Sequence, residues 1–214
     1  MKETGIAAII AVICSFLGIF NYGEEQIEEA YVLMEQKEYA AASQQFEAAI
    51  DQAEETAAKE PNEERERYVL TEAYRGLGMI SYEVDDYQMC REYLQKALDE
   101  GAEATPVMYN LIGISSMRQE DYEGALSAFE QGTALQAEEN QTGTEDTATE
   151  DSGETAAAEP EDYSEVYREM RYNTIICYEK LLDWEGAKFE AEEYLALYPE
   201  DEDIQKEYTF LKSR

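Results

Sequence analysis

Apolar and small residues recur along this chain at the spacing of one helix face. In four places an acidic residue and an aromatic are followed by a small residue three positions after the aromatic, and usually by a bulky residue four positions later. The four copies are Glu38-Tyr39 with Ala42 and Phe46, Asp86-Tyr87 with Cys90 and Leu94, Asp121-Tyr122 with Ala125 and Phe129, and Asp183-Trp184 with Ala187 and Ala191. Residues three and four apart lie on one face of an α-helix, and strand alternation is absent. The pattern therefore predicts a repeated helical unit.

A second apolar helix precedes the aromatic in the central units. It carries an aromatic, a large apolar residue and a glycine at matching positions: Tyr74, Leu77 and Gly78 in one unit, and Tyr109, Ile112 and Gly113 in the next. A glycine on a helix face allows a neighbouring helix to approach closely. We therefore expect helical hairpins, each made of a helix A, a turn closed by the aromatic, and a helix B.

These residues resemble the tetratricopeptide repeat (TPR), a helical hairpin of about 34 residues. The second unit matches at Tyr74, Leu77, Gly78, Tyr87, Cys90, Leu94 and Ala97, the third at Tyr109, Ile112, Gly113, Tyr122, Ala125, Phe129 and Gly132, the first at Ala30, Tyr39, Ala42, Phe46 and Ala49, and the fourth at Tyr178, Trp184, Ala187 and Pro199. The fourth unit departs from the family pattern at Thr174, Ile175 and Ala191. The resemblance implies an all-α, right-handed solenoid of about four hairpins, in which each unit buries its apolar face against its neighbours. For function it implies an interaction module and no particular activity.

The N-terminus carries a membrane-insertion signal. Residues 5 to 20 are uncharged and almost wholly apolar, with Lys2 before them and a strongly acidic continuation after them. An apolar helix of this length spans about 24 Å, slightly less than a hydrocarbon core of about 30 Å, so Asn21 and Tyr22 are expected at the interface. Our leading interpretation is an uncleaved anchor over residues 1 to 22, with the solenoid outside the cytoplasm. A cleaved signal, giving a secreted protein, and a soluble helix packed on the core are the alternatives.

Changes in composition divide the rest of the chain. Residues 23 to 136 hold TPR-like repeats 1 to 3, in which helices are expected to break near Pro61 and to begin after Thr105. Residues 137 to 162 contain ten acidic residues, no Lys or Arg and no large apolar side chain. We expect this segment to be an acidic disordered linker, acting as a solvated tether or as an acidic bait for basic partners or cations. Residues 163 to 214 hold repeat 4 and a C-terminal helix that caps the stack through Ile204, Tyr208 and Leu211.

Charge and residue types exclude several classes of function. A formal net charge of −34 disfavours nucleic acid, because phosphates would be repelled, and it suits basic partners or simply solubility. The chain has no histidine, which removes the usual triads and the HExxH zinc site. Cys90 and Cys177 occupy positions of small buried side chains, and their separation argues against a disulfide. We therefore predict a protein that is not an enzyme, with no cofactor and no metal site.

The candidate binding surface is the concave groove that the TPR resemblance implies. In that family the groove is lined by helix A positions that are not used for packing within the hairpin. In this sequence these positions are Ile27, Tyr31, Met34, Arg75, Met79, Tyr82, Asn110, Ile114, Met117, Arg118, Tyr172, Ile176 and Lys180. A groove rich in Tyr and Met suits an extended or helical peptide, and its three cations could orient a peptide carboxylate. Any one of these residues could instead pack against a neighbouring hairpin.

One well-known use of TPR grooves is not carried over. Family members that hold chaperone C-termini use an Asn at the ninth position of helix A as part of a carboxylate clamp. The ninth positions here are Tyr31, Met79 and Ile114, which disfavours chaperone docking.

The leading functional hypothesis is a membrane-tethered, extracytoplasmic TPR scaffold that mediates protein–protein interaction. It is similar to the short anchored TPR proteins of bacterial cell envelopes. The alternatives are a structural self-assembling envelope protein, and a regulatory accessory subunit of a membrane enzyme that senses cations through the acidic linker.

Overall fold

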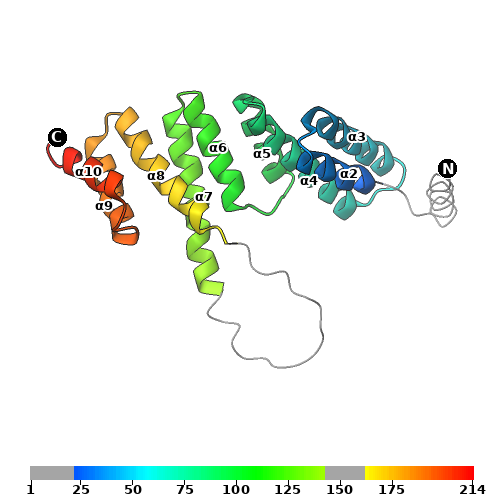
Figure 1. Cartoon of the computed structure of the whole chain (residues 1–214). Helices are drawn as coiled ribbons and strands as arrows, with labels where there is room; N and C mark the ends of the chain where they lie inside the picture. Colours follow the sequence, from blue (N-terminus) through cyan, green and yellow to red (C-terminus); the bar gives the residue numbers. More distant parts are fainter. Residues whose placement is uncertain (1–21, 143–161) are drawn as a thin grey trace. The chain divides into compact units, whose positions relative to one another are not determined.

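The computed structural model describes residues 22 to 142 and 162 to 214, and all the regular structure in these ranges is helical. The helices, labelled as in Figure 1, are α2 (Glu24–Glu35), α3 (Tyr39–Ala57), α4 (Glu63–Glu83), α5 (Tyr87–Asp99), α6 (Pro106–Arg118), α7 (Tyr122–Thr142), α8 (Ser164–Lys180), α9 (Trp184–Leu197) and α10 (Glu202–Leu211). The prediction of an all-α chain is confirmed for the described residues.

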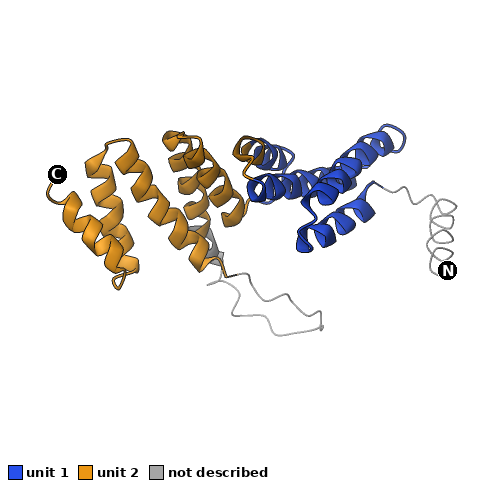
Figure 2. Cartoon of the chain, turned by 45° about the horizontal axis from the view of Figure 1, so that its top comes forward, with its two compact units in different colours: residues 1–84, 92–103 blue, residues 85–91, 104–214 orange. Residues whose placement is uncertain are grey.

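The chain forms two compact units (Figure 2). Unit 1 contains the described residues up to 84 together with 92 to 103, and unit 2 contains 85 to 91 and the described residues from 104 to 214. In unit 1, α3 packs on both α2 and α4. In unit 2, α6, α7, α8, α9 and α10 pack in chain order, and α6 also contacts α8. Each unit is therefore built from successive helical hairpins, as the sequence predicts.

The recurring aromatic marks the start of every helix B. Tyr39, Tyr87, Tyr122 and Trp184 are the first residues of α3, α5, α7 and α9. The small residues three positions later have no exposed surface; they are Ala42, Cys90, Ala125 and Ala187. The residues four positions beyond them are equally buried; they are Phe46, Leu94, Phe129 and Ala191. The predicted buried face of helix B is confirmed in all four repeats.

The turns between helix A and helix B share one backbone conformation. Two residues before each aromatic lies a non-glycine residue with φ near +60°: Lys37, Asp85, Glu120 and Leu182. After α6, the amide of Asp121 donates to the Ser116 carbonyl at 3.0 Å, and that of Glu120 donates to the Met117 carbonyl at 3.0 Å. This is a Schellman motif, in which glycine normally takes the left-handed position. The turns after α2 and α8 have the same pair of hydrogen bonds.

The acidic residue before the aromatic caps helix B. The Oδ1 atoms of Asp86, Asp121 and Asp183 accept hydrogen bonds from the amides three residues later, at 3.2, 3.0 and 3.0 Å. These caps satisfy amides that have no partner within the helix. The paired acid and aromatic therefore begin helix B in repeats 2 to 4. In repeat 1, the Glu38 side chain makes no such hydrogen bond.

Glycines in helix A provide the space into which helix B inserts its large residue. A Cβ atom on Gly113 would lie 2.2 Å from the Phe129 ring, and one on Gly78 would lie 2.6 Å from Leu94 Cγ. The prediction that these two glycines permit close helix approach is confirmed. Gly76 does the same for the preceding helix, because its Cβ would lie 2.1 Å from the Phe46 ring.

The predicted helix boundaries are also confirmed. Pro61 lies between α3 and α4, and Thr105 caps α6 through a 3.3 Å bond from the Met108 amide to its hydroxyl oxygen. In α10, Ile204 and Leu211 are buried and Tyr208 is half-buried against the cluster of α8 and α9, as expected of a capping helix. Helix α7 runs to Thr142, six residues into the predicted linker, and the remaining linker residues 143 to 161 lie outside the described residues.

The predicted N-terminal helix over residues 5 to 20 lies outside the described residues. Within residues 22–142 and 162–214, no helix is both long and apolar enough to cross a membrane. The expectation that Tyr22 lies at a membrane interface is wrong. Tyr22 is 2% exposed in the core of unit 1, its hydroxyl donates to the Glu60 carbonyl, and the Arg65 guanidinium lies 4.8 Å from its ring centroid.

We expect Gly113→Ala to destabilise unit 2 by about 2 kcal/mol or more, because the added methyl group overlaps the Phe129 ring. Urea unfolding followed by circular dichroism would measure the change. Adding Phe129→Leu to Gly113→Ala should restore part of the loss, since the smaller side chain vacates the site of overlap. Equal stability of Gly113→Ala and wild type would contradict this account of the hairpin.

Candidate functional site

In unit 1, two of the predicted groove residues are bound to one carboxylate. The Tyr31 hydroxyl donates to Glu72 Oε2 at 2.9 Å, and the Arg75 guanidinium forms an ion pair with the same oxygen. The Tyr31 ring also meets Phe46 edge-on, with centroids 5.2 Å apart. Burial raises the pKa of Tyr31 to about 12, with Arg75 opposing and Glu72 adding to the shift. The structure thus brings Tyr31 and Arg75 together but pairs Arg75 within the protein.

Of the four remaining predicted residues of unit 1, three are partly exposed and one is buried. Met34 is half-buried and packs against the core cluster of α2, α3 and α4, and Met79 and Tyr82 of α4 are also half-buried. Ile27 is 2% exposed and belongs to that core. Met34, Met79 and Tyr82 retain surface for a ligand, whereas Ile27 serves packing.

In unit 2, the predicted residues of α6 mostly serve packing. Asn110 is 6% exposed, and its Nδ2 donates to Glu169 Oε2 of α8 at 2.6 Å. Ile114 and Met117 are half-buried against the cluster that contains Phe129. Arg118 is exposed, and its guanidinium lies 6.0 Å from the Tyr87 ring centroid.

Helix α8 carries the most exposed of the predicted aromatics. Tyr172 is 41% exposed, Ile176 is half-buried and Lys180 is exposed. Tyr172 lines an open groove of about 470 Å³, together with Glu165, Val166, Arg168, Glu169, Tyr194 and Asp201. We call this depression the Tyr172 groove. Its walls come from α8, α9 and the residue that caps α10.

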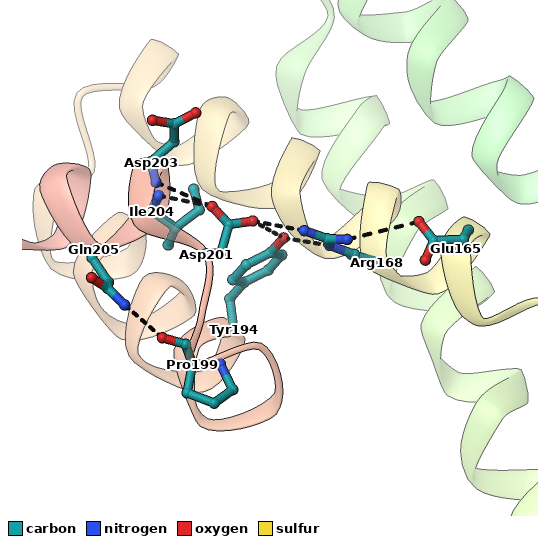
Figure 3. A network of polar contacts seen from close by, with 8 residues as sticks. All are labelled: Glu165, Arg168, Tyr194, Pro199, Asp201, Asp203, Ile204 and Gln205. Carbon is teal, nitrogen blue, oxygen red and sulfur yellow. Dashed lines mark hydrogen bonds and ion pairs between the residues drawn. The ribbon is translucent and has the colours of Figure 1, made fainter.

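A polar network centred on Arg168 fixes the shape of the Tyr172 groove (Figure 3). Arg168 Nε donates to the Tyr194 hydroxyl at 3.0 Å, and Nη2 donates to Asp201 Oδ2 at 3.0 Å. The Tyr194 hydroxyl donates to the same Asp201 oxygen at 2.8 Å. The second oxygen of Asp201 accepts the amides of Asp203 and Ile204, both at 3.2 Å. One carboxylate thereby connects α8, α9 and the start of α10.

The network determines the charge of the groove. Asp201 is held ionised, because the Tyr194 hydroxyl and then Arg168 lower the pKa of its carboxyl group. Glu165 Oε2 lies 3.9 Å from Arg168 Nη1 and is largely exposed. Glu165, Glu169 and Asp201 together outnumber the single guanidinium, so the groove has a net negative charge.

The sequence predicts Tyr172 as a residue of the concave TPR groove, but it does not predict the residues that surround Tyr172 in this depression. Glu169 takes the second position of helix A, one of the positions that line TPR grooves, so its signal was present in the sequence. Arg168, Tyr194 and Asp201 had no such signal. They meet only through tertiary packing of three helices, so no local spacing in the sequence links them.

The two cysteines within the described residues have no reactive environment. Cys90 and Cys177 are both buried and free. Burial raises the pKa of the Cys177 thiol to about 12, and it also raises that of Cys90, with the Ser115 hydroxyl opposing. Both thiols are therefore protonated at neutral pH and serve as small core residues. In the described part of the chain, no group of three or more acidic or cysteine side chains could hold a metal ion.

Comparison with solved structures shows the fold. No protein-family model and no curated protein matches the chain. The chain is similar to YrrB, a TPR protein with an unusual peptide-binding site, at 15% identity and a TM-score of 0.60, over 88% of this chain and 75% of that chain. A tetratricopeptide repeat protein from Parabacteroides merdae matches at 10% identity and a TM-score of 0.40, over 89% and 72% of the two chains. TTC0263, a TPR protein from Thermus thermophilus, matches at 16% identity and a TM-score of 0.39, over 90% and 100%. The similarity to YrrB confirms that the fold is TPR-like.

We expect acid to loosen α10 through Asp201. The pKa of Asp201 is lower in the folded protein than in the unfolded chain. The stabilisation that ionised Asp201 gives to the folded state is therefore complete above about pH 4, and it is lost as the pH falls through the folded pKa. Hydrogen exchange of the α10 amides should therefore accelerate at low pH.

The Asp201→Asn variant should exchange faster at neutral pH, with a loss of about 1 kcal/mol, and should show a weaker acid response. Asp203→Asn is the matched control, because the Asp203 side chain is exposed and lies outside the network. Equal exchange rates in the two variants would disprove the role of Asp201.

Proposed function

We propose that this protein is a membrane-tethered, extracytoplasmic scaffold of the TPR type that binds a protein or peptide partner. It would resemble the short anchored TPR proteins of bacterial cell envelopes. The observation that carries the proposal is the Tyr172 groove, where a helix A residue at a predicted ligand position remains 41% exposed above a depression of about 470 Å³. A large tyrosine left in water beside a concavity is typical of interface contact residues.

The groove is prepared for binding before a ligand arrives. Arg168, Tyr194 and Asp201 are held by hydrogen bonds of 2.8 to 3.0 Å, so these three walls lose little freedom when a partner binds. Tyr172 has only two rotatable side-chain bonds and adds contact area at low entropic cost. A rigid groove with one exposed aromatic is suited to an extended peptide segment.

Charge favours a basic partner. The groove contains three carboxylates and one guanidinium, and the whole chain carries a formal net charge of −34. Acidic partners and nucleic acid would be repelled, whereas a segment with lysine or arginine would be attracted over a Debye length of about 8 Å at physiological salt. The peptide-binding site of YrrB is a further argument for a peptide partner.

The tether rests on the apolar residues 5 to 20, which are long enough to enter a bilayer. Tyr22 already belongs to the core of unit 1. If the apolar segment is inserted and retained, no long spacer separates the membrane from the first hairpin. The folded part would then lie close to the membrane surface, near membrane-bound partners.

We expect Tyr172→Ala to reduce partner binding at least about fivefold, because it removes the exposed aromatic of the groove. Affinity capture of the tagged full chain from detergent-solubilised membranes, with quantitative mass spectrometry, would measure it. Tyr68→Ala is the control, because Tyr68 is 52% exposed on α4 and outside the groove. Equal recovery of the same partners by both variants would exclude the Tyr172 groove as their site.

We expect the full chain to sediment with membranes and to resist extraction by alkaline carbonate, because an inserted apolar helix is held by burial in the bilayer. A chain that begins at residue 22 should remain in the supernatant. Protease added outside intact cells or spheroplasts should digest the folded part of the full chain. Recovery of the full chain in the supernatant would refute the tether, and protection from protease would refute the extracytoplasmic location.

A further inference from the structure

A second depression in unit 2 lies between α7 and α9, with α8 also contributing to its lining. Its volume is about 350 Å³, and the residues that decide its chemistry are Leu126, Tyr178, Phe189, Glu130, Glu190 and Glu193. We call it the α7–α9 pocket. It shares no lining residue with the Tyr172 groove, so the two are separate surfaces.

The pocket has apolar walls that are not fully covered. Phe189 of α9 is 60% exposed, although its ring lines the depression. Tyr178 lies close to the backbone of α9, since a Cβ atom on Gly186 would be 2.6 Å from Tyr178 Cδ1. Together with Leu126, these rings offer apolar surface to a hydrocarbon chain that entered the pocket.

Three carboxylates from two helices border the same space. Glu130 belongs to α7, and Glu190 and Glu193 belong to α9. Arg171 is the cation of the lining, and its Nη2 donates to Gln136 Oε1 at 3.0 Å. Burial raises the pKa of Glu190, with Arg171 opposing and with Glu193 and Glu130 adding to the shift. One guanidinium therefore leaves the three carboxylates undercompensated, and a second cation would relieve their repulsion.

We propose that the α7–α9 pocket binds a lysine or arginine side chain from a basic peptide segment of a partner protein. The aliphatic stem of that side chain would cover Leu126 and Phe189, and its charged end would pair with Glu190 and Glu193. Long cationic side chains combine these two properties, because they bury hydrocarbon while placing charge at the tip. A second copy of this chain is a poor occupant, since each copy carries a formal net charge of −34.

The test uses a fluorescein-labelled peptide of four Gly-Lys-Leu repeats and the full chain in detergent, measured by fluorescence anisotropy at about 150 mM salt. Charges farther apart than about 8 Å are largely screened under these conditions. The triple variant Glu130→Gln, Glu190→Gln and Glu193→Gln should bind at least about tenfold more weakly than wild type. Phe189→Ala should lose about fivefold through the missing apolar wall.

Each variant has a matched control. Glu28→Gln, Glu29→Gln and Glu47→Gln remove the same charge from exposed positions of unit 1, and Leu197→Ala removes an apolar side chain that is 55% exposed on α9 outside the pocket. Both controls should bind within about twofold of wild type. The same peptide with acetylated lysines should not bind.

Three results would overturn the proposal. No binding to wild type would remove the site. Equal losses of affinity in the two triple variants would show that the net charge of the protein, and not the pocket, causes the binding. If Tyr172→Ala weakens binding and the pocket variants do not, the peptide binds in the Tyr172 groove instead. If only the pocket variants weaken binding, the α7–α9 pocket is the binding site, and the result does not test the Tyr172 groove.

Discussion

Three of the helix–helix contacts depend on a glycine of helix A that makes room for a large apolar side chain of helix B. Phe129 occupies the space that a Cβ on Gly113 would fill, Leu94 does so at Gly78, and Phe46 does so at Gly76. Such contacts bring the two helices together closely enough that few other side chains fit between them. These glycines therefore set the spacing between α4 and both α3 and α5, and between α6 and α7.

Acidic residues have structural roles that net charge alone does not suggest. Asp86, Asp121 and Asp183 cap the helices that follow them. Glu72 and Glu169, each at the second position of a helix A, accept hydrogen bonds from Tyr31 and Asn110 of the preceding helix A. Part of the acidity therefore holds neighbouring helices together, and only the remaining exposed carboxylates are available to attract partners.

The sequence allowed the hairpins to be predicted because their determinants are local and periodic. The aromatic, the small residue and the glycine recur at fixed spacings, and each was found buried or closely packed. The left-handed turn residues could not be predicted, since Lys37, Glu120 and Leu182 take a conformation that normally signals glycine. In the candidate site, Tyr172 was predicted from its helix position. Arg168 and Asp201 were not, because they are 33 residues apart and meet only after three helices have packed.

Helix α8 shows how one element can serve core packing and two ligand surfaces. Successive residues on a helix point about 100° apart, so the neighbours Arg171 and Tyr172 reach different depressions. Met170 and Cys177 of the same helix are fully buried and hold it against its neighbours. A helix fixed in this way cannot rotate to favour one surface at the expense of the other. The two surfaces therefore have compositions set by the remaining positions of the helix, polar and tyrosine-rich on one side and acidic with an exposed phenylalanine on the other.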